Sequence, residues 1–466
     1  MATPRLYEGR VLPTLNQDGT RRQIRPRLYT GRFLTGRRIV AYALIALFAL
    51  MPLIKMNGKP LMLLDVVERQ FTLFGRTFLP TDGVLLMLVL LGLFIGIIAL
   101  TALVGRAWCG WGCPQTVYME FLFRPIERLF EGDERAQMAL DKKGGGARRI
   151  AKNVVFLLLS VVVGNIFLAY FVGADRLFTW MGQSPTEHPQ GFAVMAVTAG
   201  LVFFDFAYFR EQMCTVACPY ARLQAALLDK DSLIIGYDVK RGEPRSFGKG
   251  KAGSGDCIDC GACVKACPTG IDIREGLQLE CIACAQCVDA CDSIMTKIKK
   301  PKGLIRYASQ KSLLGQTNRI FRPRVIIYGV LLVGITAALI FVGGLRKNAQ
   351  VTVLRGVGAP YVVTSEGVQS QLRVKIENHQ SSEATYELSI KFGSSGQEKV
   401  ASELGGRVIL PENPVTIEGL GRRTVGGFVI MPPGVFDRGQ LPIKVTVSDG
   451  QGDTQTIHYQ LIGPSP

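Results

Sequence analysis

The stretch that decides how this chain is organised is CIDCGACVKACP, residues 257–268, followed by CIACAQCVDAC, residues 281–291. Each half has the spacing C-x-x-C-x-x-C-x-x-x-C, and the second half repeats the first at a constant offset, Cys257 to Cys281 and Cys267 to Cys291. In two-cluster bacterial ferredoxins with this spacing, three cysteines of one half and the last cysteine of the other half hold each [4Fe–4S] cluster. The repeat therefore predicts a ferredoxin-like domain with two [4Fe–4S] clusters.

The crossed ligation pattern assigns four cysteines to each cluster. The first set is Cys257, Cys260, Cys263 and Cys291, and the second set is Cys281, Cys284, Cys287 and Cys267. Zinc sites use two C-x-x-C pairs with a longer gap between them. A disulfide framework is not expected in a reducing compartment. We therefore favour two iron–sulfur clusters over either alternative.

Outward from this repeat, composition points to a membrane protein. The chain has 466 residues, is 48% hydrophobic and carries a net charge of +17. From Lys347 onward the 11 basic and 11 acidic residues balance, so the preceding part carries the whole excess. Such an excess can indicate a nucleic-acid partner, but it also arises in the cytoplasmic loops of membrane proteins. Because the chain has long apolar runs, we expect no nucleic-acid partner.

Five apolar runs are candidates for membrane spans. They cover residues 39–54, 84–104, 154–172, 192–208 and 325–345. The segments between them are alternately rich and poor in Lys and Arg, and the rich ones belong on the cytoplasmic side. This rule places the amino terminus, residues 105–152 and residues 210–324 in the cytoplasm, and residues 347–466 outside it. All 12 cysteines then lie on the cytoplasmic side.

This topology divides the chain into five parts. They are a basic, disordered cytoplasmic arm (1–38), a four-span membrane region (39–240), a cytoplasmic ferredoxin domain (241–324), a fifth span (325–346) and an outer domain (347–466). The outer domain alternates apolar and polar residues in short runs, as at Leu372, Val374 and Ile376. This pattern predicts about seven or eight strands in an immunoglobulin-like β-sandwich.

Two smaller features bear on the membrane region. Residues 118–131 have apolar positions at helical spacing with charged residues between them, which predicts an amphipathic surface helix lying against the membrane. Asp205 lies near the inner end of the fourth span. An acid inside a membrane is a functional candidate, but so close to the interface we interpret it as a residue whose carboxylate reaches the surface.

Four further cysteines form two C-x-x-x-C-P motifs beside the membrane. Cys109 and Cys113 follow the second span, and Cys214 and Cys218 follow the fourth. In a helix, positions i and i+4 share one face, so the two pairs are candidates for one four-sulfur site. Soft thiolates select Cu(I), zinc or iron–sulfur clusters, and thiol pairs also support reversible dithiol chemistry. These residues alone leave copper, a further cluster and a redox dithiol open.

Taken together, these motifs resemble the FixG/CcoG family, the iron–sulfur accessory proteins of cbb-type cytochrome c oxidase. The resemblance rests on CGWGCPQTV (residues 109–117), on CPYARLQ (residues 218–224) and on the ferredoxin repeat, and it covers roughly residues 25–345 strongly. It implies a protein of the bacterial cytoplasmic membrane that reduces Cu(II) to Cu(I) for assembly of the oxidase. In that function Cys109, Cys113, Cys214 and Cys218 hold copper, and the two clusters relay single electrons.

The resemblance also implies partners. They are a copper chaperone or a copper-exporting ATPase, subunits of the cbb-type oxidase, and an electron donor that is a quinol, a ferredoxin or a flavoprotein; a homodimer is compatible with the sequence. Two alternatives stand beside the copper hypothesis. One is an electron-transfer subunit resembling the NapH-type quinol dehydrogenases, and the other is a non-catalytic assembly factor. The fifth span and the β-sandwich favour the copper hypothesis over the first alternative.

Overall fold

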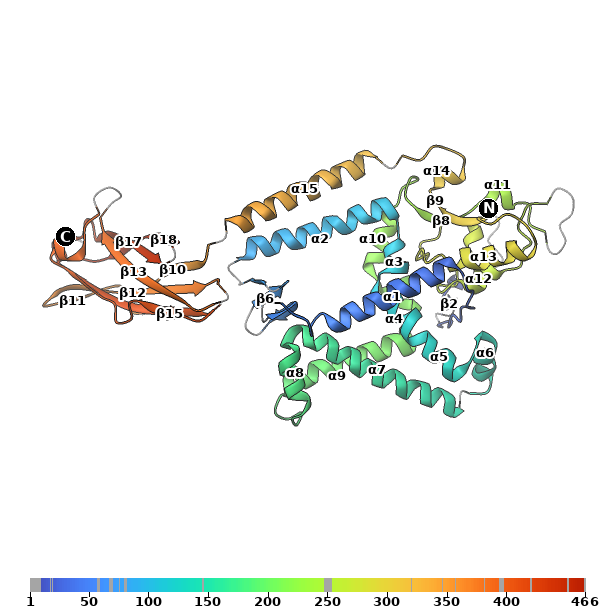
Figure 1. Cartoon of the computed structure of the whole chain (residues 1–466), viewed down its shortest axis with the longest axis horizontal. Helices are drawn as coiled ribbons and strands as arrows, with labels where there is room; N and C mark the ends of the chain where they lie inside the picture. Colours follow the sequence, from blue (N-terminus) through green and yellow to red (C-terminus); the bar gives the residue numbers. More distant parts are fainter. Residues whose placement is uncertain are drawn as a thin grey trace. The chain divides into compact units, whose positions relative to one another are not determined.

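The computed structural model describes residues 10–464, apart from 17, 19, 57–58, 67–69, 75, 79–81, 145, 247–253, 320, 346, 357, 381, 394–397, 420 and 451. The chain forms two compact units, Met1–Leu339 and Ile340–Pro466 (Figure 1). The first unit contains the membrane region and the ferredoxin repeat, and the second is an all-β domain. Each unit is described in turn.

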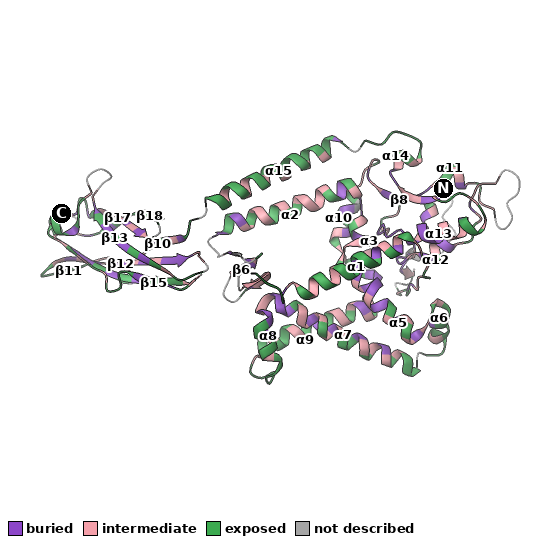
Figure 2. Cartoon of the chain, viewed as in Figure 1, coloured by how far each residue is buried: buried purple, intermediate pink, exposed green. Residues whose placement is uncertain are grey.

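The five predicted spans are confirmed as helices that are long and apolar enough to cross a membrane. They are α1 (Arg32–Leu50), α2 (Gly83–Val104), α7 (Gly146–Val172), α9 (Pro189–Phe204), which the π-helical turn η4 (Asp205–Phe209) continues, and α15 (Pro323–Gly344). Most of their residues are exposed or only partly buried (Figure 2). Apolar side chains of this kind are stable when they face lipid.

The first span begins earlier than its apolar run, and the basic arm before it is ordered. The side chain of Asp289 accepts hydrogen bonds from the backbone N–H groups of Phe33 (3.2 Å) and Leu34 (2.7 Å), which caps the amino terminus of α1 from the ferredoxin repeat. The backbone N–H of Ile24 donates to Glu211 at 2.8 Å. The prediction of a disordered arm is therefore wrong for this part. Residues 1–9 lie outside the described residues.

The ferredoxin repeat folds into two short helices that are flanked by a two-stranded antiparallel sheet. The helices are α12 (Ala262–Ala266) and α13 (Gln286–Lys297), and the strands are β8 (Ile234–Tyr237) and β9 (Ile305–Ala308). The sequence repeat is also a backbone repeat. Gly261 and Ala285 precede the two helices in the left-handed conformation, with φ of 64° and 59°. Each half thus makes the same turn around its first three cysteines.

The segment after the second span is helical as predicted, but its charged face is turned inward. It consists of α4 (Pro114–Tyr118), the π-helical turn η3 (Met119–Phe123) and α5 (Arg124–Glu131). Glu131 is only 1% exposed, whereas Leu129 is 80% exposed. The charged side chains can be buried because they are paired: Lys152 of α7 binds Glu131 at 2.8 Å, and Arg124 binds Glu120 one turn away in the same segment.

The remaining elements of this unit are short. The helices are α3 (Ala107–Trp111), α6 (Glu134–Lys142), α8 (Ala174–Met181), the π-helical turn η5 (Met213–Ala217), α10 (Pro219–Leu227), α11 (Val239–Gly242), η6 (Ile273–Glu275) and α14 (Gln310–Leu313). The strands are β1 (Arg10–Leu12), β2 (Leu15–Asn16), β3 (Lys55–Met56), β4 (Lys59–Pro60), β5 (Met62–Asp65), β6 (Gln70–Leu73) and β7 (Arg76–Phe78).

The second unit is the predicted immunoglobulin-like β-sandwich. One sheet has the order β10 (Ala349–Arg355), β12 (Gly367–Asn378), β16 (Arg422–Met431), β14 (Arg407–Ile409), with β11 (Val362–Thr364) also paired to β12. The other has the order β15 (Val415–Ile417), β13 (Ala384–Phe392), β17 (Gln440–Ser448), β18 (Thr454–Ile462). Leu372, Val374 and Ile376 are buried between the sheets, as their alternation predicts.

Candidate functional site

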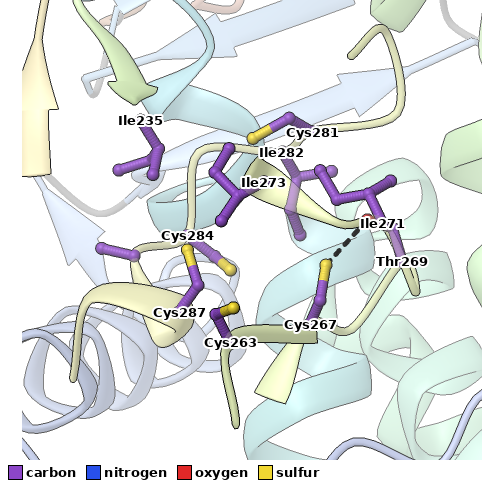
Figure 3. A pocket seen from close by; sticks show the side chains of 11 residues that line it. Ile235, Cys263, Cys267, Thr269, Ile271, Ile273, Cys281, Ile282, Cys284 and Cys287 are labelled. Atoms are coloured by element: carbon purple, nitrogen blue, oxygen red, sulfur yellow. Dashed lines mark hydrogen bonds between the residues drawn. The ribbon is translucent and has the colours of Figure 1, made fainter. Parts of the chain in front are cut away.

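The structure gathers the eight cysteines of the repeat around two cavities. The first cavity is bordered by Cys257, Cys260, Cys263 and Cys291. The second is bordered by Cys267, Cys281, Cys284 and Cys287 (Figure 3). These are the two sets that the crossed ligation pattern predicts, so each cavity takes its fourth cysteine from the other half of the repeat. Cys263 also borders the second cavity, so the two cavities are neighbours.

The second cavity has a largely apolar wall. Ile235, Ile271, Ile273 and Ile282 complete its wall (Figure 3). Among the cysteines of the first cavity, Cys260 is exposed. Burial raises the pKa of Cys284 to about 11. As a free thiol it is therefore protonated at neutral pH, and binding of iron has to displace the proton.

The spread of the sulfurs fits a multi-iron cluster. In the part of the chain that the structure describes, no three His, Cys, Asp or Glu side chains converge closely enough to hold a single metal ion. Thiolates around one zinc would lie about 3.8 Å apart, given Zn–S bonds of about 2.3 Å. In a [4Fe–4S] cluster each cysteine binds a different iron, so the sulfurs surround a wider cavity.

Two buried arginines lie beside these cysteines, and the sequence reasoning missed both. Burial raises the pKa of both Cys284 and Cys281. The charge of Arg37 acts against this rise at Cys284, and the charge of Arg106 acts against it at Cys281. Among the described groups, Nη2 of Arg37 and Nε and Nη2 of Arg106 are buried with no hydrogen-bond partner. Unpaired cationic donors suit the negative charge of a thiolate-ligated cluster. Arg106 stands three residues before Cys109, which is the signal that could have identified it.

The two C-x-x-x-C-P motifs share one local structure, which explains their proline. Cys113 and Cys218 are both extended, with ψ of 126° and 109°, and each caps a helix that begins with Pro114 or Pro219. Proline is favoured at the first position of a helix because its missing N–H would have no partner there. The expectation that each cysteine pair shares one face of a single helix is therefore wrong, since a helix begins between the second cysteine and the proline.

The four cysteines of these motifs, which we call the membrane-edge thiols, lie near one another. Cys214 is close enough to Cys109, Cys113 and Cys218 for their charges to raise its pKa further, after the larger effect of burial. Burial also raises the pKa of Cys109 to about 11. The thiol of Cys109 contacts Oε1 of Gln224 at 2.8 Å. The second motif thus supplies a polar partner to the first.

The membrane-edge thiols are packed directly on the second cavity. Cys109 forms a buried cluster with Ile282 and Cys284, and Cys214 packs against this cluster. A Cβ atom on Gly110 would lie 2.6 Å from the carbonyl oxygen of Ile282 and 2.7 Å from Cα of Cys284. Only glycine lets the first motif approach the cysteine loop this closely. Arg37 fixes the contact, because its Nε donates to the carbonyl of Gly110 at 2.8 Å.

Asp205 is half-buried and its carboxylate is hydrogen-bonded to a neighbouring segment; that it reaches the membrane surface stays an interpretation. Its Oδ1 accepts a hydrogen bond from Nε2 of Gln115 at 3.1 Å, and the same amide donates to the carbonyl of Arg210 at 3.2 Å. Gln115 directly follows the first motif, two residues after Cys113. The carboxylate is therefore tied to the segment that carries Cys113.

Three family models match the chain. They are a 4Fe-4S binding domain (residues 86–132), a 4Fe-4S dicluster domain (residues 209–310) and an "IG-like fold at C-terminal of FixG" (residues 339–464). The nitrogen fixation protein FixG of Rhizobium meliloti is 31% identical over 488 residues, which cover 94% of this chain and 92% of FixG. This chain belongs to the FixG family. Its 4Fe-4S domains and its five apolar helices are those of an electron-transfer protein of a membrane.

Two further relatives have a similar extent. Protein RdxA of Cereibacter sphaeroides is 34% identical over 395 residues, which cover 81% of this chain and 83% of RdxA. Protein RdxB of the same organism is 33% identical over 395 residues, which cover 79% of this chain and 82% of RdxB. The eight cysteines around the two cavities all lie in the segment matched by the dicluster model. Bound clusters would supply storage and transfer of single electrons at these positions.

Proposed function

We propose that this FixG-family protein reduces Cu(II) to Cu(I) at its membrane-edge thiols, for assembly of a cbb-type cytochrome c oxidase. The observation that carries the proposal is the buried cluster that Cys109 shares with Cys284, against which Cys214 also packs. Electron tunnelling slows steeply with distance, and this contact brings a second set of thiols next to a predicted cluster ligand. Clusters held by the eight cysteines of the repeat would store the electrons, and the membrane-edge thiols are the place of reduction.

The ligand chemistry of the membrane-edge thiols fits copper as the electron acceptor. Each Cu(II) takes one electron and becomes Cu(I), which soft thiolate ligands favour. Cu(I) needs only two such ligands, so the site does not require four converging sulfurs. Because burial raises the pKa of Cys109 and Cys214, copper has to displace protons when it binds. Release to a copper chaperone or exporter then returns these thiols to their protonated state.

Sidedness and partners form part of the same proposal. The alternation of basic and neutral segments supports a cytoplasmic ferredoxin repeat and a periplasmic β-sandwich in a bacterial inner membrane. Cu(I) produced on the cytoplasmic side would pass to a copper chaperone or to a copper-exporting ATPase. The β-sandwich is then free to contact oxidase subunits on the other side.

A second candidate has one observation in its favour. The family model described as a 4Fe-4S binding domain covers residues 86–132 and therefore Cys109 and Cys113. Under this reading the membrane-edge thiols hold a further cluster, and the protein passes electrons through it to another acceptor. The two candidates differ in iron content and in the product that is formed.

The test replaces Cys109 and Cys214 together with serine in the full chain. After anaerobic reduction by dithionite and removal of the excess reductant, the protein is mixed with Cu(II) and a chelator that absorbs light only as its Cu(I) complex. The double variant should form Cu(I) at least tenfold more slowly while it keeps its iron and cluster absorbance. Ala217→Ser is the matched control, since it adds a hydroxyl inside the second motif without removing a thiol.

Unchanged Cu(I) formation in the double variant would overturn the assignment of these thiols. Loss of iron from the double variant, with the two-cluster absorbance left in place, would instead support the further cluster.

A further inference from the structure

A large apolar cavity lies within the membrane region. It has a volume of about 960 Å³, and its wall is built by α1, α7, α9 and the turn η4 together with the start of α4. Aromatic side chains form much of this wall, among them Phe48, Phe167, Tyr170 and Phe206. The volume is at the upper end of the range of about 300–1,000 Å³ for sites that bind small molecules.

One end of this membrane cavity is polar. Asp205 is the only charged side chain among the described residues that line it. Its carboxylate is held by the Gln115 amide, which also lines the cavity. An acid that faces an intramembrane cavity is costly to keep there and usually marks a ligand or proton path. The cavity therefore combines a long apolar volume with one oriented proton acceptor.

The polar end adjoins the membrane-edge thiols. Gly112 and Pro114, on either side of Cys113, line the cavity, and so does Met213, which precedes Cys214. Cys214 in turn packs against the buried cluster that contains Cys109 and Cys284. A molecule bound at Asp205 would thus be next to the place where we propose copper is reduced.

We infer that this cavity binds a membrane quinol, which is the electron donor of the protein. The aromatic walls suit a quinol ring and the first part of an isoprenoid tail, and Asp205 accepts a hydrogen bond from a ring hydroxyl. A phospholipid acyl chain would fill the same volume, but it offers no hydroxyl to a buried carboxylate and no electrons to the adjacent thiols. This inference rests on the proposed function and names its donor.

One quinol gives two electrons and each Cu(II) takes one, so one quinol reduces two Cu(II) ions. The quinol loses two electrons and two protons and becomes the quinone. One electron reduces Cu(II) at the membrane-edge thiols, and the other is kept at the cysteine-ligated centres until a second Cu(II) arrives. Asp205 takes the protons one at a time and releases each to solvent. The sum is one quinol and two Cu(II) giving one quinone, two Cu(I) and two protons.

The test uses the full chain in phosphatidylcholine nanodiscs under anaerobic conditions, with decylubiquinol as the probe. Val202→Trp fills the cavity from α9. Val197→Trp is the matched control, because Val197 lies on the same helix, is 62% exposed and does not line the cavity. Two signals are read: bleaching of the cluster absorbance without copper, and retention of decylubiquinone after gel filtration.

We expect Val202→Trp to slow bleaching by decylubiquinol at least tenfold and to lose the retained quinone, while Val197→Trp stays within twofold of the wild type. Asp205→Asn should retain the quinone but bleach at least tenfold more slowly, because the proton acceptor is gone. Dithionite should bleach all variants, which shows that they are folded and loaded.

Failure of decylubiquinol to bleach the wild type would overturn the inference, as would equal rates in the two tryptophan variants. Retention of phospholipid only would do the same. Copper reduction driven by dithionite bypasses the cavity. If that reaction fails in the wild type, the proposed function is wrong, and the quinol measurement can still be read.

Discussion

At the scale of single residues, the pair of Arg210 and Glu127 holds the two motif-bearing segments together. Nη1 and Nη2 of Arg210 donate to the two carboxylate oxygens of Glu127 at 2.9 and 2.5 Å. Arg210 has a φ of 52° and is only 2% exposed. Burial alone would raise the pKa of Glu127, but the charge and hydrogen bonds of Arg210, together with the charges of Lys152 and Arg124, outweigh burial and lower this pKa to about 2. The pair therefore stays charged inside the protein.

Replacement of Glu127 by Gln should destabilise the protein by about 3 kcal/mol, because it removes the bidentate partner of the buried Arg210 charge and leaves only the longer contact with Glu211, at 3.9 Å. Since the pKa of Glu127 is lower in the folded protein than its ordinary value of about 4.3, the carboxylate stabilises the fold fully above that pH. This contribution is lost as the pH falls toward about 2. The difference in free energy of unfolding between wild type and Glu127→Gln, measured in detergent, should shrink over the same range.

The control for this prediction is an ion pair at the surface. Lys55 and Asp175 lie 2.7 Å apart, but their side chains are 49% and 73% exposed. Solvent screens such a pair, so Asp175→Asn should change the stability by less than about 1 kcal/mol. If the two substitutions had equal effects, the buried pair would not have the role that its geometry indicates.

At the scale of elements, substitution of two glycines distinguishes a collision between two packed segments from local backbone strain. A Cβ atom on Gly110 would collide with the loop that carries Cys284, whereas a Cβ atom on Gly261, where φ is 64°, would meet nothing within 4 Å. Gly110→Ala should therefore displace the first motif from the second cavity. Gly261→Ala should cost only about 1–2 kcal/mol of left-handed strain, as the alanine at the equivalent position 285 already bears.

The measurement is reduction of copper by the dithionite-reduced protein, together with thermal unfolding. Gly110→Ala should slow Cu(I) formation at least tenfold with its clusters still bound. Gly261→Ala should lower the unfolding temperature by a few degrees and leave the rate within twofold. The docking argument fails if Gly110→Ala reduces copper at the wild-type rate.

The same elements show what could be predicted from the sequence. Spans and strands were predictable because hydropathy and alternation are local, as at Leu372, Val374 and Ile376. The inward orientation of the charged side chains of α5 could not be predicted, because Glu127 is paired with Arg210, which lies 83 residues away in the sequence. The ordered arm was missed for the same reason, since its hydrogen-bond partners Glu211 and Asp289 are far along the chain. The repeat spacing predicts two sets of four ligands, and each set borders one cavity, with Cys263 bordering both.

At the scale of the whole molecule, the cysteines lie in one unit of the chain and the β-sandwich lies in the other. All 12 cysteines belong to the first unit. The second unit has its own core between two sheets, formed by apolar side chains from β10, β12, β13 and β15–β18. A domain with its own core can fold without the rest of the chain.

We therefore expect residues 347–466, produced alone, to unfold cooperatively with a free energy of about 5–15 kcal/mol. Phe392 is fully buried in this core, whereas Phe428 is 38% exposed. Phe392→Ala should cost about 3–5 kcal/mol, because it leaves a cavity, and Phe428→Ala should cost clearly less. Urea unfolding followed by tyrosine fluorescence gives both values. A fragment that unfolds without a cooperative transition, or that is destabilised equally by the two substitutions, would show that the β-sandwich depends on the membrane unit for its stability. In that case a single stability could not be assigned to either unit.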